Sequence, residues 1–172
     1  MKNFILCFVF LLFSCKPTDQ LNPDLSTPGE DTTTSPIDTE TPGQIKTWTE
    51  EFMTLVNDHR ISLGLQPLTH DESLGQIAET HSSNMARGLT SFGHTGFSSR
   101  CSAGKSALGG GNWCGENVAM GQKTPALAFK SWMNSSGHRA NIEKSRATHT
   151  GFGYAKSSGG TYYWTQIFIE KI

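Results

Sequence analysis

The sequence lacks the short motifs that mark several familiar enzyme classes. It contains no His-Glu-x-x-His for a zinc protease, no Gly-x-Ser-x-Gly turn for a serine hydrolase and no glycine-rich loop that opens a helix for phosphate binding. It also lacks an excess of one charge: from residue 47 onward, eleven basic residues stand against nine acidic ones. This even balance argues against nucleic acid as a partner.

An apolar run long enough to cross a bilayer is absent at the N-terminus. Residues 4–13 are apolar, follow the basic Lys2 and are too few to span a membrane, which is typical of an export signal. The ending Leu-Phe-Ser-Cys resembles a bacterial lipobox, so we predict a lipoprotein signal peptide over residues 1–14 and acylation of Cys15. A secretory signal without lipid remains the alternative, because Phe13 is bulky for its position.

Large apolar side chains are almost missing from residues 16–46, which carry five of the seven prolines and six acids against two lysines. Such a segment buries too little surface to offset its conformational entropy. We therefore predict that residues 15–46 are a lipidated cysteine followed by a disordered linker. The folded domain would occupy residues 47–172, with the lipid bilayer as a partner through Cys15 and a location at the outer membrane or cell surface.

Cysteine is scarce, with four residues in the whole chain. Cys7 falls in the signal peptide and Cys15 would carry the lipid, which leaves Cys101 and Cys114. In an oxidising compartment outside the cytoplasm these two are expected to form a disulfide. Two reduced thiols or a metal-binding pair are the alternatives, although a Cys-x-x-Cys spacing that would favour metal is absent.

The pattern of apolar and turn residues predicts helices first and strands last. Capping signals and helical spacing indicate helices over 48–63, from Asp71 to Gly88, and from Thr124 to Gly137. A glycine-rich stretch without periodicity between the second and third helices is expected to be a long loop. Aromatic and β-branched residues predict a hairpin of strands at 150–156 and 162–170, with a short third strand near 117–120. This order predicts an α+β fold with helices packed on a small antiparallel sheet.

One carboxylate and two histidines are spaced in a way that points to a site. Glu116 is the only glutamate of the glycine-rich region, with His94 at 22 residues before it and His138 at 22 residues after it. Two imidazoles and a carboxylate can hold zinc or move a proton near neutral pH. Alternatively, Glu116 accepts hydrogen bonds that only hold the loop to the helices, a role that the neighbouring Asn117 also suits.

Five segments of the chain form a pattern in order and spacing. They are LVNDHRISLGLQPLTHDESL, FGHTG, GENV, SWMNSSGHRANI and YYWTQIF. Together they resemble the bacterial branch of the CAP superfamily (cysteine-rich secretory proteins, antigen 5 and pathogenesis-related 1 proteins; SCP domains). The resemblance implies an α-β-α sandwich and a cleft. His94 and Glu116 match the first histidine and glutamate of the family's cleft. The second glutamate is absent after Trp132, and Tyr163 stands where the second histidine is expected.

The resemblance implies a cleft that contains His94, Glu116, His138 and Tyr163, with the second histidine supplied by the Gly-His-Arg-Ala-Asn segment. We expect a tethered ligand-binding or interaction module without turnover, whose ligand is a small lipid, an envelope or host molecule, or a divalent metal at His94 and His138. The alternative is a zinc-dependent hydrolase of envelope or host polymers with Glu116 as the catalytic base. A third hypothesis is an adhesive or structural lipoprotein.

Overall fold

The computed structural model describes the backbone of residues 42–172 and the side chains from residue 47 onward. Helix α1 (Pro42–Ser62) begins earlier than the predicted start at residue 48. A proline is well suited to the first helical turn, where its missing N–H has no helical partner. The predicted signal peptide, Cys15 and most of the predicted linker lie outside the described residues.

A mixed sheet of four strands forms the centre of the domain. Its strands run in the order β1-β3-β4-β2, with β2 at one edge. Their bounds are Thr69–His70 for β1, Cys114–Met120 for β2, His149–Lys156 for β3 and Tyr162–Ile169 for β4. The predicted hairpin is β3 and β4, and the predicted third strand is the longer β2. The sequence did not predict β1, which pairs in parallel with β3.

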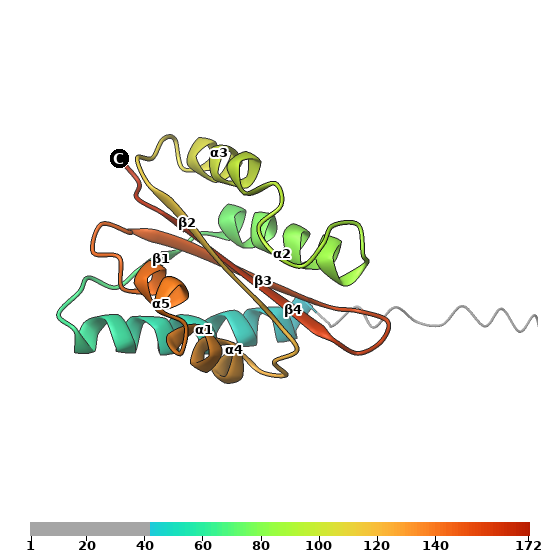
Figure 1. Ribbon diagram of the computed structural model, residues 1–172. Coiled ribbons are helices and arrows are strands. Elements are labelled where there is room, and N and C mark those ends of the chain that lie inside the picture. The colour runs from blue at the N-terminus through green and yellow to red at the C-terminus, as the bar shows by residue number, and fades with distance from the viewer. Residues whose placement is uncertain (1–41) are drawn as a thin grey trace, which may run out of the picture. The chain divides into compact units, whose positions relative to one another are not determined.

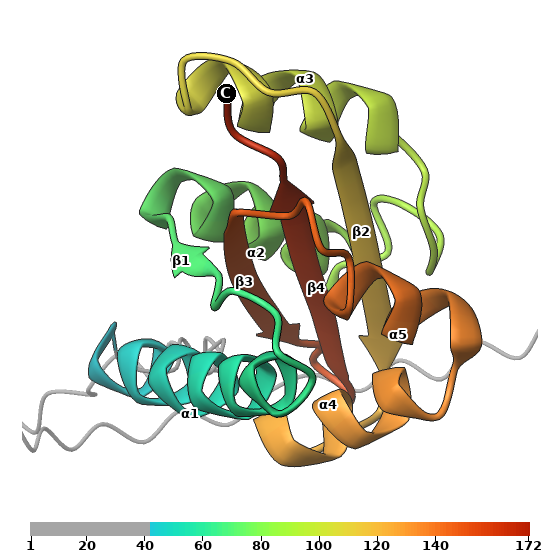
Figure 2. The same ribbon diagram turned by 90° about the vertical axis from the view of Figure 1, so that its left-hand side faces the viewer.

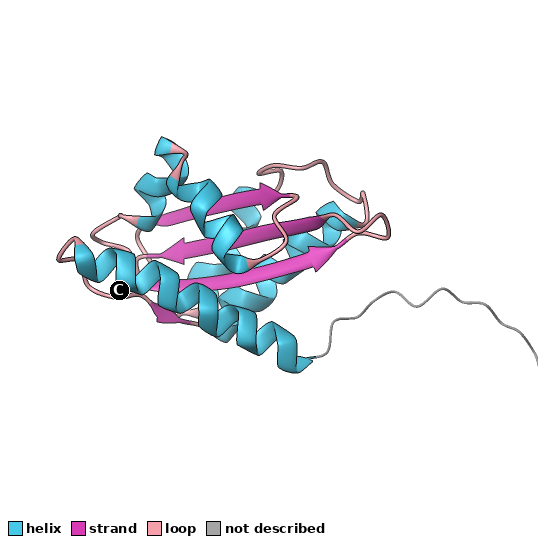
Figure 3. Ribbon diagram, turned by 90° about the horizontal axis from the view of Figure 1, so that it is seen from below, coloured by secondary structure: helices cyan, strands magenta, loops and turns pink. Residues whose placement is uncertain are grey.

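Helices cover both faces of the sheet, as the predicted α-β-α sandwich requires. Helices α2 (Glu72–Ala86) and α3 (Phe97–Ala107) lie on one face, while α1, α4 (Pro125–Met133) and α5 (Ser136–Ile142) lie on the other (Figure 1, Figure 2). Seen from below, α1 lies in front of the strands (Figure 3). The strands alternate their side chains between the two helical layers, so each layer has its own core.

The two cores divide the strand residues as that alternation predicts. Trp164 and Phe168 of β4 pack with the α1 and α4 residues Phe52 and Trp132. Ile167 and Ile169, from the same strand, pack with α2 and the end of α3 on the opposite face; that cluster is completed by Leu74, Ala78 and Leu108.

Two glycines of β3 allow α2 to lie directly on the sheet. A Cβ atom at Gly151 would lie 2.1 Å from the carbonyl carbon of Leu74, and one at Gly153 would lie 2.1 Å from the backbone nitrogen of Glu79. Backbone cannot move aside as a flexible side chain can. Glycine at these two positions therefore fixes the distance between α2 and β3.

Two short helices were not predicted. Helix α3 lies inside the stretch that was expected to be a loop, and α5 begins at Ser136, where the third predicted helix was expected to end. Each has one buried residue, Gly104 in α3 and Ile142 in α5, so neither shows an apolar period in the sequence. Within residues 42–172 no helix is both long and apolar enough to span a membrane.

Candidate functional site

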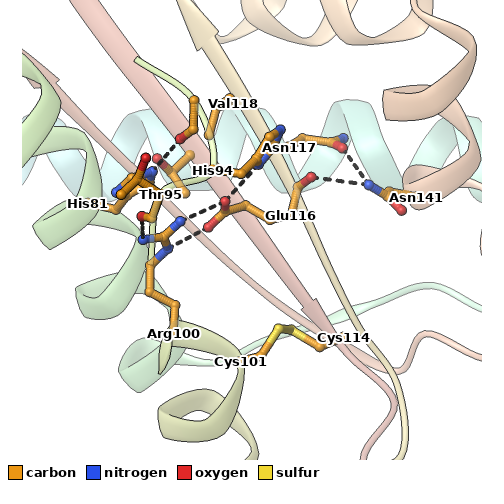
Figure 4. Close-up of polar contacts among 12 residues, drawn as sticks. His81, His94, Thr95, Arg100, Cys101, Cys114, Glu116, Asn117, Val118 and Asn141 are labelled. Atoms are coloured by element: carbon orange, nitrogen blue, oxygen red, sulfur yellow. Dashed lines mark hydrogen bonds and ion pairs between the residues drawn. A yellow bond between two sulfur atoms is a disulfide. The ribbon is translucent and has the colours of Figure 1, made fainter. Parts of the chain in front are cut away.

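The loop between α2 and α3 brings His94 against Glu116 of β2. Nδ1 of His94 lies 2.8 Å from Oε1 of Glu116 (Figure 4). The Glu116 side chain is 1% exposed, whereas that of His94 is 50% exposed. The pairing that the sequence predicted for these two residues is therefore present, with the carboxylate buried and the imidazole at the surface.

Arg100 of α3, which the sequence did not single out, holds the same carboxylate. Its Nε donates to Oε2 of Glu116 at 2.6 Å and its Nη2 donates to Oε1 at 2.8 Å, while Nη1 donates to the Thr95 carbonyl at 2.7 Å. The Arg100 side chain is 13% exposed. This bidentate geometry is the strongest form of carboxylate recognition by arginine. It fixes both the Glu116 side chain and the end of the loop that carries His94.

These contacts determine which nitrogen of His94 carries the proton. A carboxylate paired with a guanidinium accepts hydrogen bonds and donates none, so Nδ1 of His94 must be the N–H donor. When the imidazole is neutral, Nε2 then carries the free lone pair. Within the described part of the chain, no hydrogen bond engages Nε2. The site therefore presents one oriented imidazole nitrogen to whatever enters it.

The disulfide between Cys101 and Cys114 is present, with an S–S distance of 2.04 Å. This confirms the predicted pairing. Cys101 directly follows Arg100, and Cys114 precedes Glu116 by two residues, so the bridge joins α3 to β2 beside their ion pair (Figure 4). Because α3 has little apolar surface, this bond supports the position of Arg100.

A second network of amide groups joins β2 to α5. Asn141 Nδ2 donates to the Glu116 carbonyl at 3.1 Å and to Asn117 Oδ1 at 2.9 Å, and Asn117 Nδ2 donates to the His138 carbonyl at 3.0 Å. Asn117 is fully buried. These bonds hold α5 beside the cleft, which is the tying role that the sequence suggested for Asn117.

A cavity of about 300 Å³ opens beside the His94–Glu116 pair. It is bounded by α3, the start of β2 and α5, and its lining residues are His94, Phe97, Trp113, Cys114, Gly115, Glu116 and Asn141. Of the four predicted cleft residues, the structure brings His94 and Glu116 into this cavity.

The other two predicted cleft residues, His138 and Tyr163, are not among the side chains that line this cavity. His138 belongs to α5, from which Asn141 reaches the cavity. Burial, followed by the charge of His94, lowers the pKa of His138. The Tyr163 ring faces Phe92, with ring centroids 6.5 Å apart. Among the residues described, no group of three histidine, cysteine, aspartate or glutamate side chains is arranged to hold a metal ion.

The buried His81 of α2 holds the loop between α2 and α3 by a hydrogen bond. Its Nε2 donates to the Gly93 carbonyl at 2.8 Å, directly before His94 in the chain. Burial is the largest effect on the pKa of His81 and lowers it. His81 is therefore a buried histidine whose hydrogen bond is made within the protein.

The sequence model of the cysteine-rich secretory protein (CAP) family matches residues 53–168. The chain belongs to the CAP family. This CAP domain is 38% identical over 135 residues to the uncharacterized protein YkwD of Bacillus subtilis (strain 168), covering 77% of this chain and 51% of YkwD. The chain thus spans about half the length of that relative.

Two solved structures share the fold of this CAP domain. An extracellular protein of Bacillus anthracis that contains an SCP domain aligns with a TM-score of 0.63 at 28% identity, covering 76% of this chain and 44% of that one. An outer surface protein of Borrelia burgdorferi aligns with a TM-score of 0.62 at 18% identity, covering 74% of this chain and 95% of that one. The α-β-α sandwich is therefore the family fold.

Proposed function

We propose that this CAP domain is an extracytoplasmic ligand-binding module, tethered to a membrane through acylated Cys15, whose cleft holds a ligand without turnover. Membership of the CAP family supports a module of this kind. The similarity to an extracellular SCP-domain protein of Bacillus anthracis supports a location outside the cytoplasm. The lipobox-like sequence before Cys15 supports the tether.

One observation carries the proposal: His94 has one nitrogen held by the protein and one nitrogen open to solvent. Its Nδ1 is fixed 2.8 Å from the buried Glu116 carboxylate, which Arg100 in turn holds by two hydrogen bonds. An imidazole fixed in this way loses little conformational freedom when a ligand binds. Nε2 of His94 accepts a hydrogen bond when the ring is neutral and donates one when it is protonated.

The residues present do not fit a catalytic zinc ion. The Glu116 oxygens already accept three hydrogen bonds from Arg100 and His94, and the side chain is 1% exposed, so a zinc ion would have to displace one of these partners to bind it. The same engagement counts against Glu116 as the base of a hydrolase. His94 is the only histidine that lines the cavity among the described residues. We therefore favour binding over zinc-dependent hydrolysis.

The binding role is tested with a panel of small ligands of defined class. Ligand-observed NMR on the full chain would compare neutral hexoses, N-acetyl amino sugars, sugar acids, N-acetyl dipeptides and medium-chain fatty acids. We expect at least one class to bind, and its binding to be lost in His94→Ala.

His59→Ala is the matched control, because His59 is also a partly exposed histidine that contacts a glutamate, Glu143, at 2.9 Å, yet it does not line the cavity. This variant should bind as the wild type does. Absence of binding by every class, or binding that persists unchanged in His94→Ala, would refute the proposed function.

A further inference from the structure

The cavity beside His94 combines a small size with two aromatic side chains. Its volume of about 300 Å³ is at the lower end of the range for ligand pockets, ~300 to 1,000 Å³, which corresponds to a compact group rather than a long chain. Phe97 and Trp113 contribute apolar wall, while His94, Glu116 and Asn141 contribute polar groups. A long acyl chain needs a longer and more apolar channel than these residues provide.

Asn141 leaves a hydrogen-bond acceptor at the cavity wall. Asn141 Nδ2 donates both hydrogen bonds, one to the Glu116 carbonyl and one to Asn117 Oδ1, and these two acceptors fix the orientation of the amide. Its Oδ1 has no hydrogen bond within the described part of the chain and lies 3.1 Å from the position of a Cβ on Gly115, another lining residue. The cavity therefore offers an acceptor for an N–H or O–H group of the ligand.

The charges around the cavity favour an anion. The carboxylate of Glu116, the acidic residue in the lining, is already paired with Arg100. Lys144 Nζ lies 5.7 Å from the centroid of the Trp113 ring, and Arg146 Cζ lies 5.8 Å from it. Arg146 also contacts Glu170, with Nε 3.5 Å from Oε2, but no described carboxylate pairs with Lys144. Lys144 thus provides an uncompensated positive charge next to a cavity wall.

An extended peptide is a poor fit for this place, because the outer edge of β2 is closed. Strand addition needs free backbone groups along an edge strand. The Glu116 carbonyl accepts from Asn141 at 3.1 Å, and the Val118 carbonyl accepts from the Trp132 indole at 3.0 Å. The Asn141 and Trp132 side chains therefore occupy the backbone carbonyls of β2 with which an added peptide strand would pair. A sugar ring does not need hydrogen bonds to the backbone of an edge strand.

We propose that the cavity binds a carboxylated N-acyl amino sugar, as a residue of an acidic envelope or host polysaccharide. This inference rests on the proposed ligand-binding function of the His94 cleft. The apolar face of the sugar ring packs on Phe97, the amide N–H donates to Asn141 Oδ1, and the carboxylate faces Lys144, which lies over Trp113. His94 Nε2 contacts a hydroxyl group of the same ring.

The test uses two sugars that differ by one acidic substituent. N-acetylmuramic acid is N-acetylglucosamine with an added lactyl ether, which carries the carboxylate. Titration of the full chain, followed by NMR, should give an affinity about threefold to fivefold higher for the acid, the ratio expected from a partly exposed ion pair. In Lys144→Gln the ratio of the two affinities should fall to about one.

Lys130→Gln is the control for the loss of a lysine, because Lys130 neither lines the cavity nor contacts Trp113. This variant should keep the preference for the acid. Equal affinity for the two sugars, or an unchanged preference in Lys144→Gln, would overturn the sugar-acid assignment. Tighter binding of N-acetyl-alanyl-alanine than of either sugar would overturn it in favour of a peptide.

Different experimental results would refute the sugar-acid ligand and the binding function of the cleft. Binding of another class that is lost in His94→Ala would leave the cleft as a ligand site and remove only the sugar acid. If no ligand in the panel binds in a His94-dependent manner, both the sugar acid and the binding function are refuted.

Discussion

Single residues determine the chemistry of the cleft. Among them, Arg100 has the largest expected effect on the free energy of unfolding. Removing it leaves the Glu116 carboxylate, whose side chain is 1% exposed, without its cation. We predict that Arg100→Gln lowers the free energy of unfolding by about 3 kcal/mol, as is usual when one partner of a buried ion pair is removed. Urea denaturation measures this change.

The double variant Arg100→Gln/Glu116→Gln provides the control for this prediction. It carries no unpaired buried charge, so we expect it to be more stable than Arg100→Gln alone despite having one more substitution. A single variant within about 0.5 kcal/mol of the wild type would show that the pair is not coupled as its geometry indicates.

Histidine burial predicts that the domain loses stability in acid. Burial lowers the pKa of His81 in the folded state below its ordinary value of about 6.5; the hydrogen bond to Gly93 raises it, and the neighbouring charges of Arg100, Glu116 and His94 have smaller effects. Below about pH 6.5 the unfolded chain therefore binds a proton that the folded chain resists. The free energy of unfolding must then decrease as the pH falls through this range. Above about pH 6.5, His81 is neutral in both states and adds nothing to the pH dependence of stability.

Chemical denaturation at a series of pH values measures this dependence. The slope between about pH 6.5 and pH 5 should be smaller in His81→Gln than in the wild type. The absolute stability of the variant does not enter the comparison, because only the slope reports proton uptake. A slope equal to that of the wild type would exclude His81 as a source of the acid sensitivity.

The sequence predicted part of the site at this scale. The His94–Glu116 contact followed from the Gly-Glu-Asn-Val and Phe-Gly-His-Thr-Gly segments and their resemblance to the CAP family. Arg100 and Asn141 were missed, because a salt bridge and an amide network depend on tertiary distances that carry no sequence period. The signal nearest to Arg100 was its position beside Cys101, one of the two cysteines expected to pair.

At the scale of elements, α3 depends on its attachments more than on its own packing. It has one buried residue, Gly104, and is joined to β2 by the disulfide and by the Arg100–Glu116 pair. The sequence predicted a loop here for the same reason, since a helix without an apolar face shows no helical period. The helices with buried faces, α1 and α2, were predicted because their apolar residues recur at helical intervals.

Removing the disulfide should therefore destabilise the domain and loosen α3 first. In Cys101→Ser/Cys114→Ser we expect the free energy of unfolding to fall by about 3 kcal/mol, the value for closing a loop of this length. Amide hydrogen exchange should rise in α3 more than in α2, which lies directly on the sheet at Gly151 and Gly153. Equal protection of α3 before and after removal would contradict this account of α3.

At the scale of the whole molecule, the protein combines a CAP domain with an N-terminal segment that the described residues do not include. The proposed tether depends on Cys15 alone, because a lipidated cysteine would be the membrane attachment. The wild-type chain, expressed in a bacterium that processes lipoproteins, should enter the detergent phase in a Triton X-114 partition, and Cys15→Ala should stay in the aqueous phase. Partition of the variant into detergent would refute lipid anchoring.

The α-β-α plan was predictable at this scale, because the order of helices and strands and the resemblance to the CAP family led to the same architecture. The parallel strand β1 was not predictable, since two residues, Thr69 and His70, are too few to show an alternating pattern. The cavity residues other than His94 and Glu116 were likewise not predictable, because α3, β2 and α5 meet there only in the folded chain.

In the proposed site, the protein fixes His94 through Nδ1 and leaves Nε2 for the ligand. Long-range ¹H–¹⁵N NMR of the imidazole rings, with His94→Gln to assign the signal, measures this directly at about pH 8, where imidazoles are generally neutral. We expect His94 to carry its proton on Nδ1 and its Nε2 signal to shift when ligand is added. A proton on Nε2 in the free protein, or an Nε2 signal that ligand leaves unchanged, would contradict this arrangement.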